Sequence, residues 1–387
     1  MNSSSADVVI VGAGVFGTWC ALSARRAGYS VILIDQNGPG NANSSSGDES
    51  RVIRLAYHGD ELYTGLAARA LALWHEFFTA EGVESCFLKT GVLWLAEAAN
   101  LGLAGAEASL RKLGISYEHL DNSEIAYRYP QICLESATAA LYEPQSGAIM
   151  ARRAVQAVHR AALREDVQYF NEAVCPPAIT RGRLTDIRTV EGRRVEASTF
   201  FFACGAWLPK LFPALLTGLI QPTRQEFFFF EPPHDDSHFE PRLLPVWVDE
   251  TENKIAYGFP NIETAGVKTA FHTLGPRFDP DTGNRTVSGP EMDSVRAYLR
   301  KRFPALGEAA LKSARVCQYE NTSSGDFLID RHSDLENVWI VGGGSGHGFK
   351  HGPGIAEYTL GLALKGRPAE PRFLLNSKER VLNRTVL

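Results

Sequence analysis

The chain has 387 residues, of which 44% are hydrophobic and 21% charged, and its formal net charge is −5. This composition is typical of a globular protein with more than one domain, and it gives no electrostatic reason to expect nucleic acid or a membrane as a partner. No apolar run is long enough to span a membrane. The serine-rich start lacks the features of a signal peptide, so we expect a cytoplasmic protein.

The six cysteines are spread along the chain and no two share a Cys-x-x-Cys spacing. We therefore expect neither a structural zinc site nor a disulfide framework, and no metal is predicted elsewhere.

The predicted elements begin with a buried strand over 7–11, a helix over 15–27 and a second strand over 30–35. Gly28 is the expected end of the helix. Residues 37–50 are dense in Gly, Asn and Ser, which predicts a loop. Further along the chain we expect helices over 61–80, 151–164 and 354–364, and strands over 199–204, 225–230 and 337–341.

The two ends of the chain have α/β character, whereas the middle is rich in strands. This contrast predicts an α/β fold of two domains, in which a Rossmann-type nucleotide-binding domain carries an inserted substrate domain built on a mixed, largely antiparallel β-sheet. The nucleotide-binding domain would comprise residues 1–85, 150–220 and 316–387, and the substrate domain 86–149 and 221–315.

A Gly-x-Gly-x-x-Gly motif, Gly12-Ala13-Gly14-Val15-Phe16-Gly17, follows the first strand and opens the first helix. Gly12 would form the tight turn, Gly14 would let the backbone approach a pyrophosphate, and Gly17 would allow close packing of helix on strand. The helix start at Val15 and Phe16 would stabilise the phosphates. Asp35, 23 residues after Gly12, is placed to accept hydrogen bonds from a ribose. The motif predicts a dinucleotide but does not separate FAD from NAD.

Four later blocks occur in an order and spacing that are more specific than any one of them. They are Ser46-Gly47-Asp48 with Arg51, Arg54 and Tyr57; Tyr257-Gly258-Phe259-Pro260 with Lys268 and His272; Cys317-Gln318-Tyr319-Glu320-Asn321-Thr322 with Phe327-Leu328-Ile329-Asp330; and Gly344-Ser345-Gly346-His347-Gly348-Phe349-Lys350. In these blocks the chain resembles the monomeric sarcosine oxidase and N-methyltryptophan oxidase family of FAD-dependent amine oxidases, with fructosyl-amino-acid oxidases as relatives. The resemblance covers most of the chain and implies FAD as the cofactor.

The resemblance implies that Arg51 lies near the flavin and that Arg54 and Lys350 bind the substrate carboxylate. A planar guanidinium independently suits bidentate recognition of a carboxylate. Taken without the family, however, two arginines beside a loop are more often solvated surface charges.

The second block implies catalytic roles for Tyr257, Lys268 and His272, with Tyr257 also facing the substrate. In the family the lysine lies over the flavin and promotes its reaction with oxygen. Electron transfer to O2 creates an anion, so a fixed cation nearby lowers that barrier.

The third block implies that Cys317 carries FAD covalently through the 8α-methyl carbon. A neighbouring cation such as Arg315 would favour the reactive thiolate. Glu320, Asn321 and Ser324 replace the residues more usual in sarcosine oxidases, and Gly325 to Asp330 are closer to the fructosyl branch.

The fourth block implies that the helix after it directs its positive end at the flavin, where charge accumulates on reduction. Glycine backbone can approach a planar ring closely. The cofactor contacts implied by the resemblance are Ser46, Arg51, Val174, Gly205, Trp207, Cys317, Gly344, Gly346, His347, Gly348 and Lys350.

The loop before Arg51 departs from the family. Ser44, Ser45 and Ser46 stand where histidines are common, and one extra residue separates Asp48 from Arg51. The identity of the substrate therefore stays open.

The predicted function is FAD-dependent oxidation of a secondary amine or N-substituted amino acid to an imine, which hydrolyses, with O2 reduced to H2O2. The expected partners are this small molecule and O2, and we expect a monomer. Three alternatives remain at this stage: a dehydrogenase that passes electrons to a quinone or carrier protein, a non-catalytic flavin-binding assembly protein, and a nicotinamide dehydrogenase. The last leaves Cys317 and the fourth block unexplained.

Overall fold

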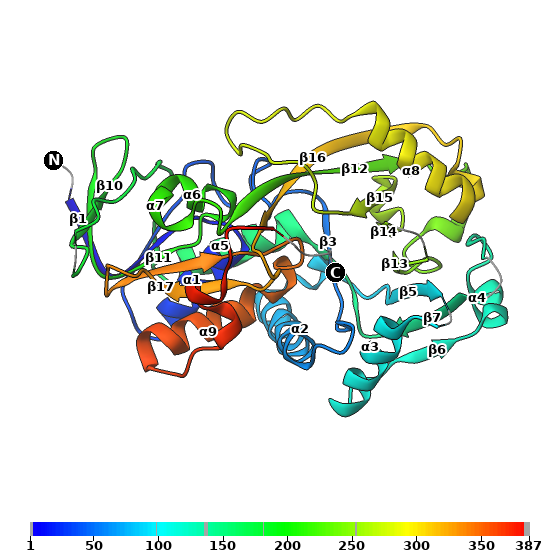
Figure 1. The fold of residues 1–387 in the computed structure, drawn as a ribbon, viewed down its shortest axis with the longest axis horizontal. Helices are drawn as coiled ribbons and strands as arrows, with labels where there is room; N and C mark the ends of the chain where they lie inside the picture. The colour runs from blue at the N-terminus through cyan, green and yellow to red at the C-terminus, as the bar shows by residue number, and fades with distance from the viewer. Residues whose placement is uncertain (1–2, 98, 135–137, 181, 252–253, 383–387) are drawn as a thin grey trace.

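The computed structural model describes residues 3–97, 99–134, 138–180, 182–251 and 254–382. Figure 1 shows one sheet with its helices on the left, a second sheet on the right, and the long strands β12 and β16 extending between them.

The first sheet has seven strands in the order β17-β18-β11-β1-β2-β9, with β10 paired to β11. β18, β11, β1, β2 and β9 run parallel, whereas β10 and β17 are antiparallel to their neighbours. The bounds are β1 (Ser3–Val11), β2 (Val31–Ile34), β9 (Gln168–Phe170), β10 (Asp186–Arg188), β11 (Arg194–Phe202), β17 (Leu328–Arg331) and β18 (Val338–Gly342).

Both faces of this sheet are covered, as parallel strands require. Side chains alternate along β1, so Val8 and Ile10 pack with the helices α1 (Val15–Arg26), α5 (Ala151–Arg164) and α9 (Gly352–Lys365). Val9 and Val11 face the opposite way and pack with the short helices α6 (Leu208–Leu211) and α7 (Pro213–Leu216) (Figure 1).

The second sheet has eight strands in the order β16-β12-β15-β14-β13-β5-β7-β6. Only β13 and β5 pair in parallel, so the sheet is mixed and largely antiparallel. The bounds are β5 (Val92–Glu97), β6 (Glu118–Leu120), β7 (Thr138–Glu143), β12 (Gln221–Phe230), β13 (Val246–Asp249), β14 (Ile255–Phe259), β15 (Val267–His272) and β16 (Leu311–Asn321).

The two faces of the second sheet have different surroundings. One face, with Phe228 and Trp247, packs under the helix α8 (Gly289–Arg302). Because the side-chain period of a strand is two, the neighbouring residues Phe227 and Val248 point to the other face, where they line a cavity.

A small third sheet has three strands in the order β3-β8-β4. It consists of β3 (Ser50–Ile53), β8 (Gly147–Met150) and β4 (Phe87–Leu88). The remaining helices are α2 (Glu61–Glu81), α3 (Leu101–Lys112) and α4 (Asn122–Arg128), and the short 3-10 turns are η1 (Glu84–Cys86), η2 (Gly205–Trp207), η3 (Ser237–Phe239), η4 (Ile262–Thr264), η5 (Pro304–Leu306), η6 (Phe349–His351), η7 (Pro371–Phe373) and η8 (Leu375–Ser377).

The predicted α/β class and the mixed, largely antiparallel second sheet are confirmed, and α5 has the predicted bounds. Several predicted bounds need correction. The strands expected over 7–11 and 225–230 each begin four residues earlier, at Ser3 and at Gln221. The strand expected over 199–204 begins at Arg194 and ends at Phe202, and Ser50, placed in the loop over 37–50, is the first residue of β3. The division into two domains stays a prediction.

Candidate active site

A large cavity, with a volume of about 400 Å³, runs from the ends of β1 and β2 to the face of the second sheet. Of the predicted site residues, only Gly17 does not line it. A Cβ on Gly17 would lie 1.8 Å from the Gly12 carbonyl oxygen, so this glycine allows helix α1 to pack on the turn. The predicted residues that do line the cavity are Gly12, Gly14, Val15, Phe16, Asp35, Ser46, Arg51, Arg54, Val174, Gly205, Trp207, Tyr257, Lys268, His272, Cys317, Gly344, Gly346, His347, Gly348 and Lys350.

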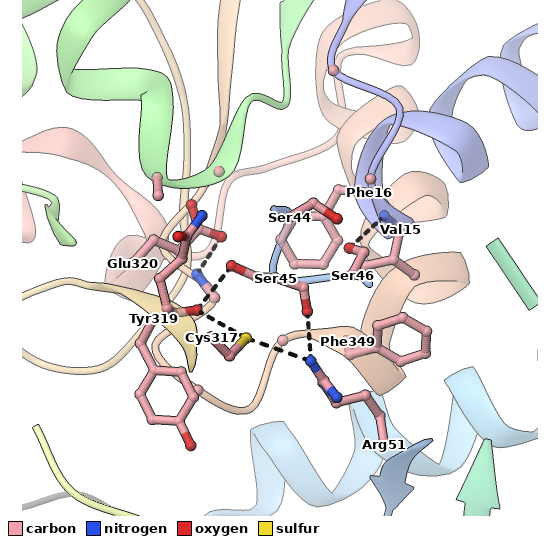
Figure 2. Close-up of a pocket in the computed structure, with 18 of the residues that line it drawn as sticks. Val15, Phe16, Ser44, Ser45, Ser46, Arg51, Cys317, Tyr319, Glu320 and Phe349 are labelled. Carbon is pink, nitrogen blue, oxygen red and sulfur yellow. Dashed lines mark hydrogen bonds between the residues drawn. The ribbon is translucent and has the colours of Figure 1, made fainter. Parts of the chain in front are cut away.

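The dinucleotide end of the cavity is formed by the turn between β1 and α1. Gly12 has φ +103°, and a Cβ there would lie 2.4 Å from the Ala203 carbonyl oxygen. The Val15 N–H, at the start of α1, donates to Ser46 Oγ at 2.9 Å (Figure 2). Ser46 therefore ties the loop before Arg51 to the helix N-terminus.

Asp35 holds this turn from the other side. Its Oδ2 accepts from the Ala13 N–H at 2.7 Å, and its Oδ1 accepts from the N–H groups of Asn37 and Gly38. Burial raises the pKa of Asp35, and these backbone hydrogen bonds oppose the effect. Asp35 thus shapes the turn, while its contact with a ribose stays a prediction.

Glycines also form the wall along the middle of the cavity. Gly346 has φ +86°, and a Cβ there would lie 2.6 Å from the Tyr319 ring and 2.8 Å from His272. His347 is fixed by contacts of Nδ1 with Tyr57 Oη at 3.1 Å and of Nε2 with the Gly325 carbonyl at 3.0 Å. Any side chain in place of Gly346 would therefore clash with the rings of Tyr319 and His272.

Three charged groups meet at the far end of the cavity. Asp48 Oδ2 lies 2.5 Å from Lys268 Nζ and 2.7 Å from Arg51 Nη1. Burial alone would raise the pKa of Asp48, but Lys268 and Arg51 together lower it to about 2. Burial lowers the pKa of Lys268, which is 2% exposed, and Asp48 opposes this. The trio keeps one net positive charge at the cavity wall.

Cys317 lies beside the same arginine. Arg51 Nη2 is 3.6 Å from Cys317 Sγ (Figure 2). Arg315, the cation we expected near the thiol, instead pairs with Glu49 at 2.8 Å on the exposed edge of the strand. A guanidinium brought from β3, not the neighbour in sequence, is the cation in contact with this cysteine.

Arg54 and Lys350 lie on one aromatic ring. The Arg54 guanidinium carbon is 4.3 Å from the Tyr57 ring centroid, and Lys350 Nζ is 5.0 Å from it. Arg54 also lies 4.8 Å from the Trp94 ring. Within the described ranges, neither side chain has a carboxylate within ion-pair distance. Burial, and then Arg54, lower the pKa of Lys350 well below its ordinary value, and Glu143 opposes this. An anion bound beside Lys350 would favour its charged form.

The rings of His272 and Tyr319 line the cavity and contact each other. His272 Nδ1 lies 3.0 Å from Tyr319 Oη. Burial raises the pKa of Tyr257 to about 12, so its hydroxyl stays protonated at neutral pH.

The comparison with known protein families places the chain. The family model described as FAD dependent oxidoreductase matches residues 7–362. The chain belongs to this family. A relative named monomeric sarcosine oxidase, from Bacillus sp. (strain B-0618), is 33% identical over 380 residues, with 94% of each chain covered. The N-methyl-L-tryptophan oxidase of Salmonella arizonae is 31% identical over 371 residues, covering 94% of this chain and 96% of the relative.

The fold of this FAD-dependent oxidoreductase is also found among solved structures. The fructosamine oxidase of Aspergillus fumigatus superposes with a TM-score of 0.78, covering 96% of this chain and 90% of the other, at 22% identity. The resemblance predicted from the four blocks is thereby confirmed.

The shape and lining of the cavity fit FAD. The cavity is continuous from the dinucleotide turn to Cys317, and it is lined where a cofactor must approach most closely by Gly12, Gly205 and Gly346, all with positive φ. A Cβ at Gly12 or Gly346 would clash with Ala203 or with Tyr319, so only glycine lets the backbone itself form the wall at these positions.

Sequence reasoning gave no role to several residues of this oxidoreductase's site. Tyr57 and Asp48 lie inside the first quoted block, and the buried ion pairs of Asp48 had no local signal. Trp94 comes into the site only through the pairing of β5 with β13, in which it lies opposite Val248. No group of three or more His, Cys, Asp or Glu side chains in the described part of the chain is arranged to hold a metal ion. None of the helices described here combines the length and apolar character needed to cross a membrane.

Proposed function

We propose that this oxidoreductase uses FAD to oxidise a secondary amine of an N-substituted amino acid to an imine, with O2 as the electron acceptor. The observation that carries the proposal is the pair Arg54 and Lys350. They are 6% and 2% exposed, face the cavity, and have no carboxylate partner among the described residues.

A carboxylate on the substrate supplies the missing anion. Arg54 can offer two parallel N–H groups to it, and Lys350 adds a further charged donor. Tyr57 beneath both cations fixes where the carboxylate lies. The amine is thereby held at a set distance from this anchor, on the side where Tyr257 and His272 line the cavity.

The positive charges also act on the substrate amine. A cation nearby disfavours an ammonium group, so the site favours the neutral amine, the form that can be oxidised. Oxidation removes two electrons and two protons from the C–H and N–H bonds and gives the imine, and water then hydrolyses it. FAD, when bound, supplies the two-electron acceptor for this step.

Lys268 is proposed to assist the return of electrons to O2. Reduction of O2 to H2O2 passes through an anion, which a nearby positive charge stabilises. The trio of Lys268, Arg51 and Asp48 offers one net positive charge in a largely buried part of the cavity wall. Detection of H2O2 in air tests this acceptor. A protein that turns over only with an added quinone would contradict it.

Cys317 is proposed as the covalent attachment point of the flavin, because Arg51 lies against its sulfur. After acid precipitation, yellow colour in the pellet is expected, and Cys317→Ala should move it to the supernatant. Colour that is released from the unaltered protein would refute the covalent bond and leave the flavoenzyme proposal intact.

The two relatives, named for oxidation of sarcosine and N-methyl-L-tryptophan, support N-methyl amino acids as the first substrates to test. The relative named monomeric sarcosine oxidase also supports our expectation of a monomer. The direct test is an anaerobic screen of N-methyl and sugar-modified amino acids for bleaching of the flavin absorbance. Bleaching by members of either class supports the proposal, and no bleaching by any amine would contradict it.

A further inference from the structure

Glu320, at the end of β16, has an oxygen atom that the protein leaves unpaired. Its Oε1 accepts from the Gly344 N–H at 3.1 Å. Its Oε2 is buried and has no hydrogen-bond partner among the described residues, and the residue is only 7% exposed. Leaving a buried acceptor unsatisfied is costly, so such an atom in a native fold calls for a partner that the chain alone does not supply.

The surroundings of Glu320 contain backbone and open cavity rather than cations. No lysine or arginine in the described ranges lies within ion-pair distance of its carboxylate. A Cβ on Gly342 would lie 3.2 Å from Oε2, and one on Gly205 would lie 3.7 Å from it. Glu320 itself lines the cavity (Figure 2). Burial raises the pKa of Glu320 to about 7, and only the backbone N–H groups of Gly344 and Gly343 oppose this.

The position of Glu320 along the cavity defines which part of the cofactor it faces. On one side, Gly205 follows Cys204, whose Sγ lies 3.2 Å from the Val11 carbonyl next to Gly12. On the other side, Cys317 is three residues earlier on β16. Glu320 therefore lies between the dinucleotide turn and the proposed flavin attachment point.

The part of FAD between the pyrophosphate and the isoalloxazine ring is the ribityl chain, which is rich in hydroxyl groups. A hydroxyl is a donor that a carboxylate accepts strongly. We propose that Glu320 binds the cofactor, with its Oε2 accepting a hydrogen bond from a ribityl hydroxyl of FAD. The proposal rests on the FAD site and not on the identity of the amine.

Glu320→Gln is the most selective variant. The glutamine keeps the shape and one carbonyl oxygen for the Gly344 N–H, but places an amide donor where Oε2 was. The hydroxyl can no longer donate there and can only accept from the amide, so a hydrogen bond to a charged acceptor is replaced by a weaker neutral one. If the amide turned over, it would instead face the Gly344 N–H with a donor, so one orientation weakens the ribityl hydrogen bond and the other loses the bond from Gly344.

The experiment measures the dissociation constant of FAD from apoprotein in a Cys317→Ala background, in which the flavin is releasable in every case. Deoxy analogues of FAD, each lacking one ribityl hydroxyl, are measured beside FAD. Glu49→Gln is the matched control, because it removes one charge near the site from a side chain that pairs with exposed Arg315 and does not line the cavity. Circular dichroism spectra establish that each variant is folded.

We expect Glu320→Gln to weaken FAD binding about tenfold, while Glu49→Gln changes it less than about twofold. Loss of one particular hydroxyl should cost the unaltered background a similar factor and should cost the Glu320→Gln protein clearly less, because both changes act on the same hydrogen bond. Equal affinities of the background and its Glu320→Gln variant, or penalties that add for every analogue, would overturn the proposal. Failure of the background itself to bind FAD would instead overturn the FAD site as a whole.

Discussion

At the dinucleotide end of the cavity, backbone N–H groups are hydrogen-bonded by side chains that lie nearby in the sequence: the Val15 N–H donates to Ser46, and the Ala13 N–H donates to Asp35. At the opposite end, the contacts join segments hundreds of residues apart, such as Lys268 with Asp48 and Arg51 with Cys317. The dinucleotide end is formed by backbone whose shape depends on glycines. The opposite end is a set of charged side chains whose positions depend on the register of several strands. Substitutions at the dinucleotide end should abolish flavin binding, whereas substitutions at the charged end should slow one reaction step more than another.

The largest effect is expected from Gly12→Val. A β-branched residue at φ +103° is strained, and its Cβ would lie 2.4 Å from the Ala203 carbonyl oxygen. We expect complete loss of bound flavin, measured by absorbance of the purified protein. Gly65→Ala in α2 is the control, since a Cβ there meets nothing within 4 Å, and flavin content should be unchanged. Normal flavin content in the Gly12 variant would place the cofactor elsewhere.

Removal of the cation at the far end should affect one half-reaction. Lys268→Met is expected to slow reoxidation of the reduced flavin by O2 on the order of 100-fold or more, with flavin reduction by substrate changed much less. Stopped-flow measurement of both half-reactions checks this. Equal slowing of the two would remove Lys268 from the oxygen step.

The same residue predicts a pH dependence. Only the protonated lysine supplies the positive charge, and burial lowers its pKa below the ordinary lysine range. The reoxidation rate should therefore be highest at low pH and fall as the pH rises through this lowered pKa. A Lys268→Met protein that kept the same profile would assign the pH dependence to another group.

Loss of one substrate anchor should have a smaller effect. Arg54→Met removes a charged hydrogen-bonding partner, worth about 1.5–3 kcal/mol, so we expect KM for the amino acid to rise about 10- to 100-fold. Arg69→Met is the control, because Arg69 pairs with Glu357 on an exposed helix surface. An unchanged KM in the Arg54 variant would mean that the substrate has no carboxylate at this position.

The smallest effect concerns the stability of the apoprotein. The pKa of Glu320 is raised in the folded state to about 7, so the folded protein holds this proton more tightly than the unfolded chain does. The stability that the protonated group contributes is present at pH 4 and is lost as the pH rises toward 7 and above. Glu320→Gln should therefore raise the free energy of unfolding at pH 8 but not at pH 4, by no more than about 3 kcal/mol. Calorimetry showing the same difference at both pH values would contradict the shift.

The strand, turn and helix at the dinucleotide end could be predicted from the sequence because their signals are local. A strand, three glycines, a helix and an acidic residue lie within 35 residues of the chain, and each constrains its neighbours directly. The helix over 151–164 was predicted to the residue because its apolar positions repeat at helical spacing over its whole length.

The charged end could be predicted only as far as family resemblance names residues. The resemblance implied that Arg51, Lys268 and Cys317 all lie near the flavin. It gave no role to Asp48, whose carboxylate pairs with both cations. It also could not supply Trp94, whose place depends on the pairing of β5 with β13, or the unpaired oxygen of Glu320. Nearness in the sequence was a poor guide for Arg315. We expected it beside the Cys317 thiol, but its side chain is partly exposed to solvent and pairs with Glu49. Strand register and burial decide these features, and neither can be read from a short motif.

In the proposed function, Arg54 and Lys350 hold the carboxylate of an amino-acid substrate over the FAD site. The most direct measurement is anaerobic flavin reduction by an N-methyl amino acid compared with the same amine without its carboxyl group. We predict rapid, saturable bleaching by the amino acid and at least about 100-fold slower bleaching by the decarboxylated amine at equal concentration. Equal rates with the two compounds, or reduction by neither class of amine, would show that these two cations do not anchor the substrate.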